Sequence, residues 1–366
     1  MVRRPRMSPL HDERLAAWLG VALGASLGAV FLTGLVSHFM QNAPAWAAWP
    51  SRPVNLYRVT QGVHVIGGLA IIPLLLAKLW TVYPRLFRWP PFLGAGDAVE
   101  RAVVGLLVPA ALFQVVTGLF NIAYWYPFPF FFTVAHYWTA WILAGAVLVH
   151  ALNQRRKVAH AMMTKPDDAV PRRRFLLAVG ATSGVVVLTT VGETLRPLAR
   201  LALLAPRLPR TGPQELPVNR SAYAAGTTAL ANDDGWRLRV TGRVARPLVL
   251  SRADLRALPQ RTERLPIACV EGWSASATWT GVRVRDLLDL AGAAPDARVR
   301  VESLERTGVY RRSWLDAPHA RDPLTLLALG VNGAPLDADH GAPLRLVAPN
   351  RPGVMQTKWV GELVVT

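Results

Sequence analysis

Long uncharged stretches dominate the first half of the chain and predict helices that cross a membrane. A bilayer-spanning helix needs about 20 mostly apolar residues. The third stretch is longer than one span and contains NIAYWYPFPF, a turn-like sequence with Pro127 and Pro129, so we divide it into two helices. A soluble bundle would show a polar face on each helix, which these stretches lack. The pattern therefore predicts five spans, at 15–37, 59–77, 102–123, 131–153 and 175–192.

After residue 196 the pattern changes to short apolar runs separated by turn residues. Two short helices are expected at 251–259 and 281–292, the first with Ser251 as its N-cap. This mixture predicts a β-rich α+β domain at 212–366, which is long enough to form its own core. Its strands are expected at 236–244, 248–251, 265–270, 297–304, 308–315, 344–348 and 358–365.

The two patterns together divide the chain into a membrane part and a C-terminal domain. A linker rich in proline and arginine joins them. The expected parts are a cytoplasmic N-terminus (1–14), a four-helix membrane domain (15–155), a basic cytoplasmic loop (156–174), a fifth span (175–195), the linker (196–211) and the α+β domain (212–366).

Composition and charge support a membrane protein. Of the 366 residues, 52% are hydrophobic and only 17% are charged, which excludes a disordered chain. The net charge of +18 alone would suggest nucleic-acid binding, but the positions of the basic residues do not. Fifteen Lys and Arg residues flank the spans on the membrane side that holds the N-terminus, and only Arg52 and Arg58 flank them on the opposite side. By the positive-inside rule, the N-terminus is cytoplasmic and 212–366 is extracytoplasmic. The charge thus reports topology at a lipid membrane, and no nucleic-acid partner is expected.

Four histidines lie in or at the ends of the predicted spans, where ionisable residues are costly. His38, His64 and His136 all lie toward the outer side, and His150 follows His136 by fourteen residues on one helix. That spacing is about 21 Å along the helix axis, on nearly the same face. Neutral imidazole is a common axial ligand of haem iron, although a hydrogen bond to a neighbouring helix is the structural alternative for any one of them.

We expect one outer haem b held by His64 and His136. His38 is an alternative ligand or a quinone-site residue. His150 would hold a second haem only with a partner at inner depth, for which His11 is the one candidate. This placement of histidines resembles the four-helix b-type cytochrome subunits of membrane formate dehydrogenases and nickel hydrogenases, over residues 15–155.

The fifth span follows the sequence PRRRFLL at 171–177. It resembles a twin-arginine export signal placed inside the chain. An ordinary anchor with basic residues on its cytoplasmic side fits the same charges. Twin-arginine export carries folded proteins, which would suit a domain that receives its cofactor in the cytoplasm.

Cys269 is the only cysteine of the chain, so it cannot form an internal disulfide. A lone cysteine is either a small buried hydrophobe or a thiolate ligand for a soft metal. It lies in IACVEGWS at 267–274, and two further motifs follow: VNGAPL with HGAPLRL (331–336 and 340–346), then Pro349, Gly353 and TKWV (357–360). In this order, the motifs resemble those of the sulfite-oxidase-fold molybdopterin oxidoreductases over most of 212–366.

The resemblance implies a molybdenum–molybdopterin cofactor, with Cys269 as the thiolate ligand of the metal and the catalytic centre. Arg345 and Lys358 match positions that contact the pterin and its phosphate, and such a phosphate favours fixed cationic donors. Further implied contacts are His340, Gln356, Thr357 and Ser303, with Asn219 and Tyr223 from an upstream motif. The family's substrate-binding arginine cluster has no clear counterpart, so the substrate does not carry over.

These expectations combine into a membrane-bound molybdenum oxidoreductase that exchanges electrons with a b-type haem and the quinone pool. It would transfer an oxygen atom to or from an external small molecule. Two directions stay open: reduction of an S- or N-oxide, and oxidation of a sulfite-like anion. The alternative is a pterin-binding or docking module without turnover, carried on a quinone-linked cytochrome b.

Overall fold

The computed structural model describes residues 10–44, 46–87, 89, 94–163, 170–205 and 211–366. Two compact units make up the chain: 1–34, 63–191 and 201–206 form the first, and 35–62, 192–200 and 207–366 form the second. Five basic residues on which the predicted topology depends lie outside the described residues: Arg3, Arg4, Arg6, Arg88 and Lys165. Part of the predicted linker also lies outside them.

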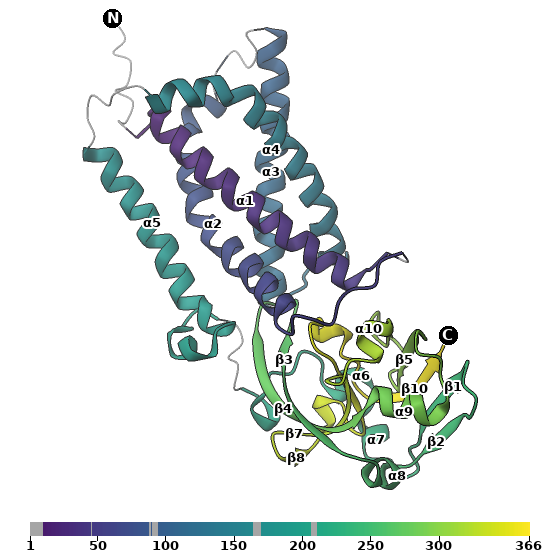
Figure 1. Ribbon diagram of the computed structural model, residues 1–366. Coiled ribbons are helices and arrows are strands. Elements are labelled where there is room, and N and C mark those ends of the chain that lie inside the picture. The colour runs from purple at the N-terminus through teal and green to yellow at the C-terminus, as the bar shows by residue number, and fades with distance from the viewer. Residues whose placement is uncertain (1–9, 45, 88, 90–93, 164–169, 206–210) are drawn as a thin grey trace, which may run out of the picture. The chain divides into compact units, whose positions relative to one another are not determined.

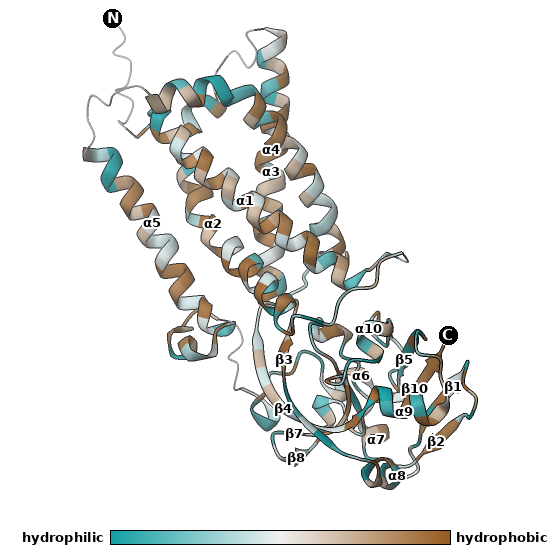
Figure 2. Cartoon of the chain, viewed as in Figure 1, coloured by the Kyte–Doolittle hydropathy of each residue, from teal (hydrophilic) through white to brown (hydrophobic). Residues whose placement is uncertain are grey.

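Five long helices account for most of the first unit, and each is long and apolar enough to cross a membrane. This confirms the predicted membrane helices (Figures 1 and 2). Several extend beyond the uncharged stretches, because lysine and arginine are good helix formers and do not end a helix. The bounds are α1 (Glu13–Gln41), α2 (Leu56–Leu86), α3 (Ala95–Ile122), α4 (Phe132–Met163) and α5 (Val170–Thr190).

The helices of this unit pack through a narrow apolar seam. Leu23 of α1, Ile71 and Leu75 of α2, Ala110 of α3 and Leu143 of α4 are buried together. Many other large apolar side chains remain exposed on the outer faces of the helices. A soluble domain rarely exposes so large an apolar surface, whereas a lipid environment stabilises it.

The second unit contains two five-stranded sheets. In the first sheet the strand order is β2-β1-β10-β5-β6, with β1 parallel to β10 and the other pairs antiparallel. Its strands are β1 (Leu238–Gly242), β2 (Leu248–Leu250), β5 (Val299–Ser303), β6 (Arg312–Leu315) and β10 (Val360–Val365).

The second sheet follows the order β3-β4-β7-β8, and β9 pairs with β7 on a separate branch. All of its pairs are antiparallel. Its strands are β3 (Arg261–Ala268), β4 (Ser274–Arg283), β7 (Leu326–Val331), β8 (Ala334–Pro335) and β9 (Arg345–Val347).

Short helices connect these strands. The α-helices are α6 (Ala222–Ala225), α7 (Thr228–Ala231), α8 (Arg252–Ala257), α9 (Val284–Ala291) and α10 (Ala317–Ala320). The 3₁₀ helices are η1 (Val191–Glu193), η2 (Arg196–Leu201), η3 (Pro213–Glu215), η4 (Ala338–His340) and η5 (Gly353–Met355).

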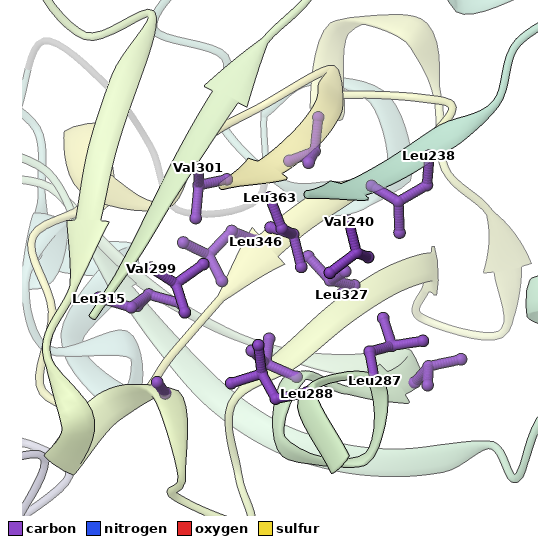
Figure 3. Packing of buried hydrophobic residues seen from close by; sticks show 14 of the residues in the cluster. Leu238, Val240, Leu287, Leu288, Val299, Val301, Leu315, Leu327, Leu346 and Leu363 are labelled. Carbon is purple, nitrogen blue, oxygen red and sulfur yellow. The ribbon is translucent and has the colours of Figure 1, made fainter. Parts of the chain in front are cut away.

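The main core of the second unit lies where α9 meets strands of both sheets (Figure 3). Leu287 and Leu288 of α9 pack with Val240 of β1, Leu327 of β7 and Leu363 of β10. The alternation of buried and exposed residues along β1 explains how one face of the strand reaches this core. The predicted β-rich α+β domain is therefore confirmed.

Local predictions in this domain were partly right. Ser251 does cap its helix: its hydroxyl accepts from Asp254 N–H, and the Asp254 carboxylate accepts from Ser251 N–H. The helix expected at 281–292 begins only at Val284, and 281–283 belong to β4. The reason is close strand pairing, because a Cβ on Gly281 would lie 2.1 Å from the Leu327 carbonyl oxygen.

Residues 50–57 are bound tightly to the rest of the second unit. Asn350 is buried in a left-handed conformation (φ 47°). Its side chain accepts from Tyr57 N–H (2.8 Å) and donates to the Pro50 carbonyl (2.8 Å), while its own N–H donates to the Val54 carbonyl (3.0 Å). Arg52 adds an ion pair to Asp322 at 3.0 Å. This segment is therefore an integral part of the unit that contains Cys269.

Candidate active site

Cys269 lies in the tight turn that joins β3 to β4. Its N–H donates to the Trp273 carbonyl (2.9 Å), and Gly272 N–H donates back to the Cys269 carbonyl (3.1 Å). Gly272 has φ 100°, a conformation that glycine adopts without strain. Trp273 anchors the turn from within, since its indole donates to the Glu271 carboxylate at 3.1 Å. The turn fixes a nearly fully buried thiol at the edge of the second sheet.

A cavity opens beside this thiol. The cavity is narrow, with a volume of about 10 Å³. Segments far apart in the sequence enclose it, and several of the residues expected at the site are among them. The lining residues are Leu216, Pro217, Asn219, Ile267, Cys269, Trp273, His340, Arg345, Gly353 and Lys358.

Two buried cations dominate the electrostatics of this cavity. Lys358 donates to the carbonyls of Arg220 (2.9 Å) and Asp339 (2.7 Å). Arg345 donates to the His340 carbonyl (3.0 Å), and its Nε atom is buried without a hydrogen-bond partner among the described residues. Burial lowers the pKa of Lys358 to about 7 and that of Arg345 to about 10. Their fixed partners are carbonyl oxygens, so the site favours an added anion.

His340 contributes as a neutral group. Its Nε2 lies 2.6 Å from the Pro213 carbonyl, so this nitrogen carries the proton and donates. Burial and the nearby Arg345 charge lower the pKa of His340 to about 4. The imidazole therefore ties the segment before α6 to the cavity without adding a third charge.

Three other expected residues form hydrogen bonds next to the strand end that carries Lys358. The Ser303 hydroxyl donates to the Lys358 carbonyl (2.8 Å). Thr357 shares a 2.7 Å hydrogen bond with Ser313. Gln356 donates to the Arg351 carbonyl (3.2 Å), and its Oε1 is buried without a partner in the described part of the chain. These residues hold the strand end that carries Lys358.

Tyr223 does not line the cavity. Its side chain is 88% exposed on α6, whereas Asn219 from the same motif does line it. Sequence reasoning did not assign Trp273, Leu216 or Pro217 to the cavity lining. Trp273 could have been found, because it lies in the same turn motif as the cysteine, but Leu216 and Pro217 carry no signal of their own.

The residues around this cavity fit a molybdopterin cofactor with a phosphate group. A buried thiol lies beside buried cationic and amide donors, and the Arg345 Nε atom lacks a partner among the described residues. Gly341 (φ 108°) lets the Lys358 backbone approach closely, since a Cβ there would lie 2.9 Å from Lys358 Cβ. Cys269 would hold the metal, and Arg345 and Lys358 would bind the phosphate.

The depressed pKa of Lys358 predicts a pH-dependent stability of the cofactor-free protein. An unfolded lysine titrates near pH ~10.4. Between about pH 7 and pH 9.5 the unfolded state therefore holds a proton that the folded state loses, and the free energy of unfolding rises with pH, by roughly 2–3 kcal/mol. Urea unfolding of the detergent-solubilised chain, followed by hydrogen exchange in β1 and β10, measures this rise. Lys358→Met is expected to abolish it, and an unchanged slope in this variant would contradict the assignment.

The structure also brings together His64 of α2 and His136 of α4 in the first unit. Their ring centres lie 6.2 Å apart with an interplanar angle of 74°. Nδ1 of His64 is 2.8 Å from the Val30 carbonyl, and Nδ1 of His136 is 2.9 Å from the Thr117 hydroxyl. A Cβ at Gly34 would lie 2.9 Å from the His64 ring, so glycine provides the space for this imidazole.

The other expected histidines are placed separately. The His150 Nδ1 atom is buried without a partner among the described residues. His11 lies 3.2 Å from the Thr81 carbonyl and against Trp80. His38 belongs to the second unit, where its ring lies against Phe39. Within the described residues, no group of three or more His, Cys, Asp and Glu side chains could hold a metal ion.

Comparison with known proteins identifies the domain around Cys269. Residues 225–366 match the model of the oxidoreductase molybdopterin-binding domain. The catalytic subunit MsrP of the protein-methionine-sulfoxide reductase from Campylobacter jejuni is 26% identical over 228 residues, covering 56% of this chain and 76% of the relative. The same subunit from Xanthomonas campestris is 36% identical over 143 residues, covering 35% of this chain and 44% of the relative.

Among solved structures, the sulfane dehydrogenase SoxCD from Paracoccus pantotrophus matches with 26% identity and a TM-score of 0.34, over 36% of this chain and 38% of that one. The family match begins at Ala225, the last residue of α6, and runs to Thr366, so it includes Cys269, Arg345 and Lys358. Residues 225–366 therefore form an oxidoreductase molybdopterin-binding domain, which makes the chain a molybdenum oxidoreductase.

Proposed function

We propose that this enzyme reduces an S-oxide outside the cytoplasmic membrane with electrons from the quinol pool, passed through a b-type haem. The cavity beside Cys269 carries the catalytic half of this proposal. Two relatives of this chain are named as catalytic subunits of protein-methionine-sulfoxide reductase. These names favour sulfoxide reduction over sulfite oxidation. The net reaction balances as R₂S=O + QH₂ → R₂S + H₂O + Q.

In this reaction the residues of the second unit would bind and orient the molybdopterin cofactor. Bound molybdenum supplies oxygen-atom exchange coupled to two electrons. Cys269 holds the metal at a fixed place, because its turn is closed by two backbone hydrogen bonds. Arg345 and Lys358 secure the pterin phosphate, and Ser303 holds the Lys358 backbone. The buried setting excludes water and strengthens each of these electrostatic contacts.

The geometry of His64 and His136 supports the haem. Both imidazoles would hold the haem iron, because their ring centres lie only 6.2 Å apart. Hydrogen bonds at both Nδ1 atoms leave Nε2 for the iron and fix the ring orientations. His38 remains a candidate quinone-site residue, and His150 a candidate ligand only with a further partner.

The proposal includes the predicted topology and domain division. The N-terminus would be cytoplasmic and the molybdopterin domain at 212–366 extracytoplasmic, exported after cofactor insertion by the twin-arginine route. Support comes from fifteen basic residues on one side of the spans against two on the other. In this topology, His64 and His136 would lie near the extracytoplasmic ends of α2 and α4.

A substrate panel on purified membranes tests the function. Prereduced haem is expected to be oxidised on addition of methionine sulfoxide or another alkyl sulfoxide, with about one molybdenum per chain. Reduction of the haem by sulfite would instead reverse the direction of electron flow. Haem oxidation that does not depend on molybdenum, or a chain that lacks molybdenum in a cofactor-producing host, would favour the docking alternative.

A further inference from the structure

Two side chains from outside the molybdopterin-binding domain bind the turn that carries Cys269. Gln61, in the second turn of α2, donates through Nε2 to the Val270 carbonyl (3.3 Å). Thr194, the residue after η1, donates through Oγ1 to the Gly272 carbonyl (3.0 Å). Both donors and the turn belong to the second unit. Two carbonyl groups of the turn are therefore bound by residues that precede the domain in the sequence.

Both donors are buried and held in place. Gln61 is 5% exposed and Thr194 is 6% exposed. The Ser37 hydroxyl donates to Gln61 Oε1 (2.9 Å), which leaves the amide nitrogen to the turn. Gly62 lets Thr194 approach α2, since a Cβ on this glycine would lie 2.8 Å from Thr194 Cγ2. Hydrogen bonds in such a buried setting are strong, and a carbonyl that loses its donor there is destabilising.

Further contacts connect the same segments to the strands on either side of the turn. The Arg58 guanidinium donates to Ser276 Oγ (3.0 Å) in β4, and also to the Thr194 carbonyl (3.2 Å). Tyr57, 1% exposed, packs against Ala268, the residue directly before the cysteine. The beginning of α2 and the segment after η1 thus form one hydrogen-bonded support for the turn.

This support is additional to the closure of the turn by its own backbone. The two hydrogen bonds within 269–273 fix the local shape of the turn. They do not fix its orientation relative to the rest of the unit, whereas the side chains of Gln61 and Thr194 do. Residues that orient a metal ligand without touching the metal typically contribute about 10- to 100-fold to metal affinity or activity. The match to the molybdopterin-binding domain begins only at residue 225, so that domain does not supply these two donors.

We infer that Gln61 and Thr194 are positioning residues for Cys269, which hold its turn so that the thiol is oriented toward the metal. The inference rests on the proposed role of Cys269 as the metal ligand and adds the residues that orient it. It also gives α2 a part in both proposed metal centres, because the same helix carries His64.

The test measures how readily the turn opens in the cofactor-free, full-length chain in detergent. Cys269 is the only cysteine and is 1% exposed, so the rate of its alkylation by N-ethylmaleimide reports opening of the turn. Gln61→Leu and Thr194→Val each remove one donor at nearly constant volume. Both are expected to accelerate alkylation, measured by mass spectrometry, by about 3- to 20-fold.

Two variants serve as controls. Thr194→Ser retains the hydroxyl and is expected to react at the rate of the unaltered chain. Thr325→Val makes the same change at another buried threonine of this unit, whose hydroxyl has no partner among the described residues. It should also leave the rate unaltered. In the molybdenum-loaded chain, the electron paramagnetic resonance spectrum of Mo(V) should change in Gln61→Leu and Thr194→Val and stay the same in both controls.

The outcomes separate this inference from the proposed function. Unaltered alkylation rates in both Gln61→Leu and Thr194→Val would overturn the inference, whatever the molybdenum content. Equal acceleration in Thr325→Val would also overturn it, because the effect would then be a general loosening of the unit. If Cys269→Ser retained its molybdenum, the proposed role of the cysteine would fail, whereas the alkylation rates would still report the hold on the turn. The Thr194→Val and Thr194→Ser pair decides the question by itself if Gln61→Leu does not fold.

Discussion

Replacement of Cys269 by serine is expected to abolish sulfoxide reduction and to lower the molybdenum content of the purified chain. Cys269 is the only cysteine, and no second thiolate can substitute. A serine hydroxyl is a harder and less acidic ligand than a thiol, so it binds a soft metal centre poorly. Loss of contacts that only support a ligand already costs about 10- to 100-fold, and loss of the ligand itself is expected to exceed that. Elemental analysis and turnover rates measure both effects.

The fold is expected to survive this change, because the turn at 269–273 is closed by backbone hydrogen bonds that serine retains. Thr262→Ala, on the exposed part of the preceding strand β3, is the matched control and should leave both quantities unaltered. Full activity with a normal molybdenum content in Cys269→Ser would remove Cys269 from the metal site.

Replacement of either His64 or His136 by alanine is expected to remove the b-type haem spectrum. Both imidazoles would bind one iron, since their ring centres lie 6.2 Å apart. Each variant should therefore retain less than about a tenth of the reduced-minus-oxidised absorbance, and haem oxidation by a sulfoxide should stop with it. Molybdenum content should stay unaltered, because Cys269 and the cavity beside it belong to the other unit.

His160→Ala, an exposed position on the same helix as His136, is the control for general effects on α4. His38→Ala and His150→Ala test whether either residue is also a haem ligand. Loss of half of the absorbance in His150→Ala would indicate a second haem. Full absorbance in both His64→Ala and His136→Ala would refute the assignment of this pair.

The membrane half of the fold was predictable because its signal is carried by single uncharged stretches. Each needs no information from elsewhere in the chain, and all five helices were located. The ends of the helices were not located correctly, since Lys78 and Arg85 continue α2 and Arg155 continues α4. Good helix formers at a membrane surface extend a helix beyond its apolar part.

The C-terminal domain was less predictable in detail. The long strand β4 has the sequence SASATWTGVR, whose small residues give no clear alternation, and only pairing with β3 and β7 makes it a strand. Cys269, Arg345 and Lys358 were found because they lie in recognisable motifs. Leu216 and Pro217 were not, because a cavity built from segments far apart in the sequence leaves no local pattern.

The three hydrogen bonds between Asn350 and residues 50–57 limit how the chain can be divided into independent parts. Cutting the chain at the linker would separate Asn350 from the backbone groups of Pro50, Val54 and Tyr57, and Asp322 from Arg52. A transplanted catalytic unit would therefore need residues 50–57 as well as the part of the chain after the linker.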